Sequence, residues 1–264
     1  AAFGYSMLYP ITDNYIDNKL HSPEQKQEYN RLIHDKLSGR YVYPLTKHQK
    51  KTCALLSAIE NEYPRSSCSE IYQLLLMMLD AQKESLRQQN RDEFLSEDER
   101  LNISLYKGGI SVLIDRYLVK NPLNDEDILT YLKFGFFLQL ADDLQDIGTD
   151  GRQGYQTILT LQSTQADREK IINKLLHFIH NSLTEFKCEN ETFKDFVLSN
   201  CYMLILTSVI ESREFFSDKY IRQIEKHLPV KSDYLAEYKI SQNISLDKKA
   251  EKKYLNMLDV VISK

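Results

Sequence analysis

The chain has 264 residues, which is enough for a large domain with a sizeable hydrophobic core. It contains only 8 glycines and 6 prolines, well below average usage, and this scarcity favours long helices over frequent turns. The net charge of −4 provides no basic surface of the kind that binds nucleic acid, so we expect no nucleic-acid partner.

Helix start and stop signals divide the chain into a series of helices. Ser22, Pro23 and Glu24 form a typical start, with a capping hydroxyl, a proline in the first turn and an acidic residue near the positive end of the helix dipole. Ser96 and Glu99 have the spacing of a capping box. In chain order, the expected helices cover approximately residues 1–18, 22–37, 46–62, 68–90, 96–119, 124–147, 165–187, 190–212, 216–227 and 245–262.

The connecting segments contain no strand signals. Residues 148–154 include three glycines and are expected to form a loop. Because no alternation of strands and helices and no internal repeat occurs, we predict an all-α fold, and we interpret residues 1–264 as a single domain. The sequence begins inside an apolar helix and without an initiator methionine, so we expect further residues upstream of Ala1.

The cysteines and the apolar runs bear on the cellular compartment. The four cysteines have no CxxC spacing and are interpreted as reduced thiols: Cys53, Cys68, Cys188 and Cys201. No signal peptide is visible, and the longest apolar runs, 134–141 and 202–210, are too short to cross a bilayer. We therefore expect a cytoplasmic protein without a transmembrane segment.

The most informative motif is a DDxxD pattern near the end of a very apolar helix. Asp142 and Asp146 lie one turn apart on the stripe that also carries Gln139, and Asp143 lies beside that stripe. Because the rest of the helix is apolar, we expect it to be buried, and buried carboxylates require cations. Magnesium suits two carboxylates whose Cβ atoms are about 5–6 Å apart, as those of Asp142 and Asp146 would be. We expect Asp142, Asp143 and Asp146 to be catalytic metal ligands. The alternative is a solvated helix end beside the loop at Gly148.

A second pair of aspartates occurs near the start of the chain. Asp13 and Asp17 have the same spacing of four residues, on a helix that is otherwise mainly apolar. This DxxxD pattern is weak alone, and an exposed helix terminus is its alternative interpretation. As a partner of the DDxxD pattern it predicts a second set of magnesium ligands.

Together, the two patterns resemble those of the class I isoprenoid synthase superfamily. Asp142 follows Asp17 by 125 positions, and the stretch from Gln139 to Gly154 is the most specific part of the resemblance. The DxxxDN form of the first motif, with Tyr15 and Ile16 inside it, is most similar to that of bacterial large-terpene synthases. The resemblance implies a helical bundle with a central active-site cavity, in which two facing aspartate helices hold three magnesium ions and a prenyl diphosphate.

The resemblance also suggests residues that bind the substrate. Arg152 resembles a basic residue that contacts the diphosphate after the second motif, and Gln139, Tyr9 and Asn18 lie on or beside the two motifs. Lys107 precedes two glycines in mid-helix. We expect the glycines to break the helix, so that Gly108 exposes backbone to the cavity and Lys107 meets a phosphate. The alternative is a close helix–helix contact at the glycines, with Lys107 exposed.

These residues predict a magnesium-dependent class I terpene synthase that ionises and cyclises a prenyl diphosphate. One alternative is a prenyltransferase, which either elongates a chain or joins two prenyl diphosphates as squalene and phytoene synthases do. Another is a non-catalytic helical protein that binds lipids or a partner helix. A homodimer, the substrate chain length and the product skeleton are left open by the sequence.

Overall fold

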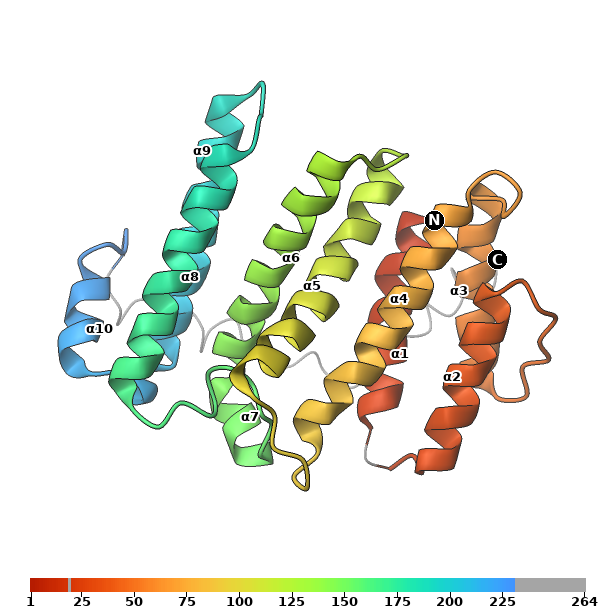
Figure 1. Cartoon of the computed structure of the whole chain (residues 1–264), viewed down its shortest axis with the longest axis horizontal. Coiled ribbons are helices and arrows are strands. Elements are labelled where there is room, and N and C mark those ends of the chain that lie inside the picture. The colour runs from red at the N-terminus through yellow and green to blue at the C-terminus, as the bar shows by residue number, and fades with distance from the viewer. Residues whose placement is uncertain (19, 231–264) are drawn as a thin grey trace, which may run out of the picture. The chain divides into compact units, whose positions relative to one another are not determined.

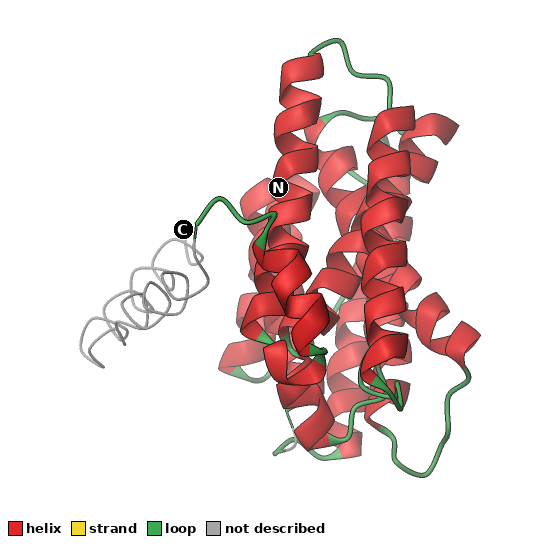
Figure 2. Ribbon diagram, turned by 90° about the vertical axis from the view of Figure 1, so that its left-hand side faces the viewer, coloured by secondary structure: helices red, strands yellow, loops and turns green. Residues whose placement is uncertain are grey.

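The computed structural model describes residues 1–18 and 20–230, and within these ranges the protein contains ten α-helices and no strand (Figures 1 and 2). The all-α prediction is therefore confirmed for this part of the chain. The expected helix at 245–262 lies outside the described residues. The α-helices are α1 (Ala2–Asp17), α2 (Pro23–Leu37), α3 (Lys47–Glu62), α4 (Ser69–Ser85), α5 (Glu97–Val119), α6 (Asp125–Gln145), α7 (Ile147–Gln153), α8 (Gln165–Glu185), α9 (Glu191–Glu211) and α10 (Asp218–Glu225).

Side-chain caps explain where several helices begin. The Ser22 hydroxyl accepts a hydrogen bond from the Gln25 backbone N–H, and the Gln25 side chain accepts one from the Ser22 N–H at 2.9 Å. Ser96 and Glu99 form the same reciprocal pair, as their spacing predicts. Each pair satisfies two backbone donors that the first turn of a helix leaves without partners.

Residues 148–153 are helical, although a loop was expected over 148–154. Helix α7 begins at Ile147, whose side chain is buried, and it ends at Gln153, followed by Gly154, which has a left-handed backbone with φ 77°. The Asp150 N–H donates to the Asp146 carbonyl at 2.8 Å. The loop prediction was wrong because the buried Ile147 side chain anchors this turn against the core, and two internal glycines do not prevent a helix that is held in this way.

Contacts between residues group the chain into two compact units. Of the described residues, the first unit comprises 1–18, 20–84 and 114–122, and the second comprises 85–113 and 123–230. The interpretation of residues 1–264 as one domain stays a prediction.

In the first unit, α1 and α2 both pack on α3. Gly4 allows the close approach of α1, because a Cβ atom there would lie 3.1 Å from both the Leu55 carbonyl oxygen and the Ile59 side chain. Tyr29 of α2 is fully buried, and its hydroxyl is 2.7 Å from the Thr52 hydroxyl of α3.

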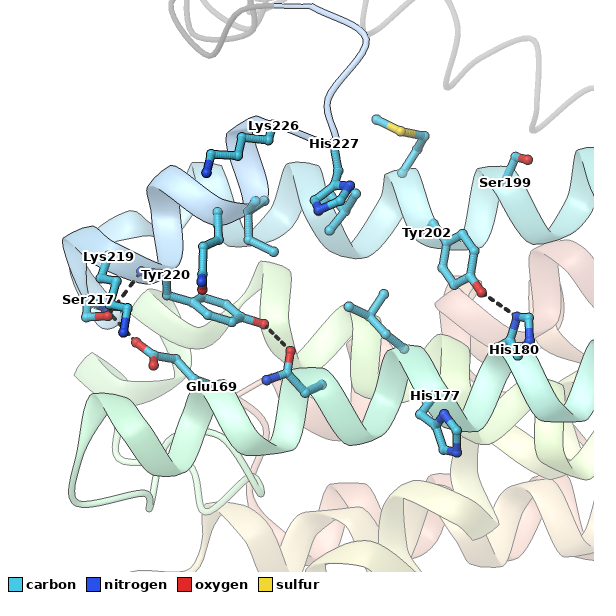
Figure 3. Close-up of a pocket in the computed structure, with 16 residues that line it drawn as sticks. Glu169, His177, His180, Ser199, Tyr202, Ser217, Lys219, Tyr220, Lys226 and His227 are labelled. Carbon is cyan, nitrogen blue, oxygen red and sulfur yellow. Dashed lines mark hydrogen bonds between the residues drawn. The ribbon is translucent and has the colours of Figure 1, made fainter.

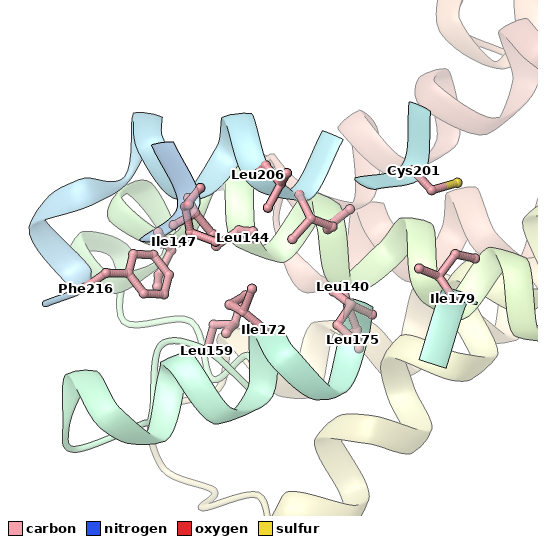
Figure 4. Close-up of a cluster of buried hydrophobic side chains, with 14 of the residues drawn as sticks. Leu140, Leu144, Ile147, Leu159, Ile172, Leu175, Ile179, Cys201, Leu206 and Phe216 are labelled. Atoms are coloured by element: carbon pink, nitrogen blue, oxygen red, sulfur yellow. The ribbon is translucent and has the colours of Figure 1, made fainter. Parts of the chain in front are cut away.

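In the second unit, α6 packs against α8 and α9, and α9 also packs against α8 and α10. The shared core consists of aliphatic and aromatic side chains from these helices (Figure 4). Its fully buried members include Phe137, Leu144, Ile172, Ile179, Ile205 and Val209. Each such side chain contributes about 1.5–3 kcal/mol by leaving water, so this cluster holds the C-terminal half of α6 firmly.

Helix α9 is long and apolar enough to cross a membrane by length and composition alone, and 33% of its most apolar window is buried within the protein. The mainly apolar run at 202–210 is shorter than this helix because polar residues precede it. The buried apolar side chains of α9, among them Ile205 and Val209, belong to the core of the second unit. The absence of a transmembrane segment stays a prediction.

Candidate metal-binding site

The DDxxD motif lies where α6 ends and α7 begins. Asp142 and Asp143 are in the last turn of α6, and Asp146 is the residue that joins the two helices. Asp142 and Asp146 are exposed, whereas the Asp143 residue is only 6% exposed. The expectation that burial of the helix would enclose all three carboxylates was therefore wrong for Asp142 and Asp146. They share a stripe that points away from the core, and Asp143 projects from a different side of α6.

Asp143 is held by two polar side chains. The Gln139 amide donates to one of its carboxylate oxygens at 3.1 Å, and the Ser104 hydroxyl of α5 lies 3.4 Å from the other. The same Gln139 nitrogen lies 3.5 Å from a carboxylate oxygen of Asp142. Gln139 therefore stands between the first two aspartates of the motif.

Burial raises the pKa of Asp143 to about 7, because the charged form loses its hydration. The hydrogen bond from Gln139 opposes this rise, and the charges of Asp142 and Asp150 add to it. Lys107 also lowers the pKa of Asp143. Asp143 therefore takes up a proton more readily than an ordinary aspartate does.

Helices α5 and α6 approach each other at glycines, and α5 continues through Gly108 without a break. A Cβ atom on Gly108 would overlap the Gly135 carbonyl oxygen and would lie 2.7 Å from the Gln139 Cβ atom. The predicted helix break was wrong, and the alternative of a close helix–helix contact describes this place. Only glycine permits such a backbone contact. A role for Gly108 in substrate binding stays a prediction.

A fourth aspartate that sequence reasoning missed belongs to this cluster. Asp150 follows Asp146 by four residues and Asp142 by eight, a spacing that would have placed it on their stripe had residues 148–154 been predicted as helical. Burial raises the pKa of Asp150 to about 6, and repulsion from Asp146 and Asp142 adds to the rise. The positive charge of Lys107 opposes it. Lys107 is half-buried. The alternative that expected a close helix–helix contact was therefore wrong in expecting Lys107 to be exposed.

Arg152 lies on α7, exposed, and not on a loop. Its guanidinium donates a hydrogen bond to the Thr149 hydroxyl at 3.1 Å within the same helix. Arg152 follows Asp150 by two residues, so it belongs to the same short helix as the fourth aspartate. Its contact with a diphosphate stays a prediction.

The first motif occupies the last turns of α1. Asp13 and Asp17 are half-buried, and Asn18 ends the helix, with its side-chain oxygen accepting the Leu20 N–H at 2.8 Å. Tyr9 is also half-buried, two turns before the end of the helix. These residues lie in the first unit, and the DDxxD cluster lies in the second. The predicted facing of the two motifs stays a prediction.

An aromatic stack supports the end of α1. The Tyr15 ring centroid lies 3.8 Å from that of His21 and 4.7 Å from that of His48, with both imidazoles stacked on the phenol. The Tyr29 ring is 4.1 Å away, and its hydroxyl is 3.1 Å from the His48 Nε2 atom. Burial lowers the pKa of His48, and the charges of His21 and Lys51 act in the same direction.

Within residues 1–18 and 20–230, no three side chains of His, Cys, Asp or Glu converge closely enough to hold a metal ion by themselves. Magnesium does not need such a cage, because it keeps several waters and is held by one or two carboxylates together with substrate phosphates. The exposed pair Asp142 and Asp146 fits this requirement in donor type and in access to solvent.

A pocket of about 1120 Å³ lies elsewhere in the second unit, between α8, α9 and α10 (Figure 3). Its walls include Leu206 and Met203 as well as polar pairs, such as His180 with the Tyr202 hydroxyl at 2.7 Å. None of the predicted site residues lines it. The sequence offered no signal for this pocket, because its lining residues come from three helices and form no motif.

No family model matches the chain, and no curated protein or solved structure is significantly similar to it.

Proposed function

We propose that the protein is a class I terpene synthase that binds a prenyl diphosphate through magnesium, ionises it and cyclises the resulting cation. The observation that carries the proposal is the cluster at the α6–α7 junction. There, exposed Asp142 and Asp146 share a helix stripe. Both lie close enough to Asp150 to raise its pKa, and Lys107 lies close enough to lower it. The resemblance of the DDxxD and DxxxDN patterns to those of bacterial large-terpene synthases supports the same function.

The charges of the cluster suit a divalent cation with a polyanionic substrate. The cluster contains three carboxylates and one positive side chain that interact with one another around Asp150. The carboxylates are those of Asp142, Asp146 and Asp150, and the positive side chain is Lys107. Such a group attracts divalent cations and repels free diphosphate. When bound, magnesium neutralises the diphosphate and stabilises the charge that develops as it leaves.

The chain's own residues would then bind and orient the substrate. Lys107 and Arg152 supply positive charges for phosphate oxygens, and the planar guanidinium of Arg152 can contact two oxygens at once. We assign Asp13 and Asp17 to the second set of metal ligands, with Asn18 beside them. Tyr9 offers an aromatic face that can stabilise a nearby carbocation by about 2 kcal/mol once water is excluded.

The reaction tests the proposal directly. The purified protein, with magnesium, is incubated separately with farnesyl, geranylgeranyl and geranylfarnesyl diphosphate, and diphosphate release and hydrocarbon products are measured. A cyclase converts a single prenyl diphosphate. A product that forms only when isopentenyl diphosphate is also present would instead indicate a chain-elongating prenyltransferase, and no turnover of any substrate would favour a non-catalytic helical protein.

Variants of the motif connect the activity to the site. Asp142→Asn and Asp146→Asn should each lower kcat/KM by on the order of 10²-fold or more, because each removes charge stabilisation at the leaving group. Asp195→Asn, an exposed aspartate on α9, is the matched control and should keep wild-type activity. Diphosphate release that persists in an Asp142→Ala, Asp146→Ala double variant would contradict the metal assignment.

A further inference from the structure

We infer that Asp143 is not a metal ligand but a positioning residue, which holds Gln139 and through it orients Asp142. The inference rests on the proposed function, because it assigns roles within the same motif. It separates three aspartates that the sequence pattern treats alike.

The surroundings of Asp143 differ from those of its neighbours in the motif. Its residue is 6% exposed, and each carboxylate oxygen already faces a donor, Gln139 at 3.1 Å and Ser104 at 3.4 Å. A magnesium ion keeps several of its waters, so a ligand must lie open to solvent or substrate. Asp142 and Asp146 meet this condition, and Asp143 does not.

Gln139 is restrained at both ends. Its Cβ atom packs against α5 at Gly108, where the space left by the missing side chain is already filled by Gln139 and Gly135. Its amide nitrogen donates to Asp143 and lies 3.5 Å from a carboxylate oxygen of Asp142. A side chain fixed in this way has few rotamers left, so its amide can limit the orientations of the exposed Asp142 carboxylate.

Each of these contacts depends on the one before it, from the packing of α5 on α6 to the orientation of Asp142. The glycine contact fixes the spacing of α5 and α6, and this spacing places Ser104 beside Asp143. Asp143 then orients Gln139, and Gln139 orients Asp142. Residues that support a metal ligand in this manner affect metal affinity although they never touch the metal.

Substitution by asparagine distinguishes a ligand from a positioning residue. In Asp143→Asn, the side-chain oxygen can still accept from Gln139, and the new amide can donate to the Ser104 hydroxyl. In Asp142→Asn, the metal loses a charged ligand, and no hydrogen bond made by the new amide replaces it. The two variants replace the same carboxyl group by the same amide, one residue apart, so each controls for the other.

The measurement is calorimetric binding of Mg²⁺ and inorganic diphosphate to the full chain, with thermal unfolding recorded for every variant. We expect Asp143→Asn to bind within about threefold of the wild type, and Gln139→Ala to bind about 10–100-fold more weakly. Asp142→Asn should weaken binding at least as much as Gln139→Ala. Asp143→Ala should resemble Gln139→Ala, and the recovery of binding in Asp143→Asn is the signature of a positioning role.

The outcomes separate the inference from the proposed function. If the wild type binds no diphosphate with Mg²⁺, the proposed function is wrong. If the wild type binds and Asp143→Asn weakens binding as much as Asp142→Asn does, the function stands and the positioning role is wrong. Should Asp143→Ala fail to fold, the asparagine pair and Gln139→Ala still decide between these outcomes.

Discussion

The two helix ends that carry aspartates at a spacing of four residues are supported in different ways. At the end of α1, two imidazoles stack on Tyr15, and the neighbouring carboxylates of Asp13 and Asp17 are half-buried. On α6, a buried carboxyl in the last turn and a backbone contact between glycines in the middle of the helix take the place of the rings. The same sequence spacing thus occurs on a helix end held by aromatic packing and on one held by polar contacts.

Because of this difference, the two helices should respond differently to substitutions and to pH. A contact between backbones cannot yield, so substitution of a glycine in the α5–α6 contact should act through steric overlap and be severe. A stack of rings that includes imidazoles should respond to loss of a hydroxyl and to pH, by smaller amounts. Three substitutions, in order of decreasing effect, would break or sharpen this contrast.

The largest effect is expected for Gly135→Ala. Its Cβ atom would overlap the Gly108 backbone, which has no side chain that could move away, so the helices must separate. We expect a loss of about 3 kcal/mol or more in the free energy of unfolding, measured by urea denaturation. Gly151→Ala is the matched control, because a Cβ atom there meets nothing within 4 Å. It should leave stability unchanged or raise it by up to about 1 kcal/mol. Equal stabilities of Gly135→Ala and the wild type would show that the contact is not tight.

An intermediate effect is expected for Tyr29→Phe in the first unit. The substitution keeps the buried ring but removes the hydroxyl that bonds to Thr52 and His48. Thr52 keeps its hydrogen bond to the His48 carbonyl at 3.1 Å, which limits the loss. We expect the free energy of unfolding to fall by about 1–2 kcal/mol. A loss as large as that of Gly135→Ala would remove the proposed contrast between the aromatic stack at the end of α1 and the glycine contact on α6.

The smallest effect concerns pH and His48. Burial lowers the pKa of His48 in the folded protein, whereas in the unfolded chain it has its ordinary value of about 6.5. The unfolded state therefore binds more protons as the pH falls below about 6.5, and the stability that depends on neutral His48 is lost on acidification. The groups that face His48 or its stack are Tyr15, Tyr29, His21 and Lys51, together with Glu28, which acts on Tyr15.

Replacing His48 tests this linkage. In His48→Gln, the difference in unfolding free energy between pH 7.5 and pH 5 should shrink by about 0.5 kcal/mol, a modest amount because the ring is only half-buried. Above about pH 7.5 the variant and the wild type should differ by a constant amount, since the imidazole is neutral in both states. An unaltered pH dependence in the variant would exclude His48 as a source of acid sensitivity.

Most of the helices, and the shared stripe of Asp142 and Asp146, could be predicted from the sequence alone. Caps are local, so the starts at Ser22 and Ser96 could be predicted from a few neighbouring residues. The position of the aspartates on one stripe of α6 also follows from the helical repeat, and the structure agrees for Asp142 and Asp146.

Tertiary structure decided which way each aspartate faces and what it contacts. The burial of Asp143 depends on α5, and the sequence does not state which helix covers which side of α6. The glycines at 108 and 135 are distant in sequence, so their contact and the unbroken course of α5 could not be predicted from local propensity. Asp150 was missed for the same reason, because α7 is stabilised by the burial of Ile147 and not by its own glycine-containing sequence. Local hydrogen bonding determines where helices begin, whereas the partners of a side chain depend on surfaces that only packing brings together.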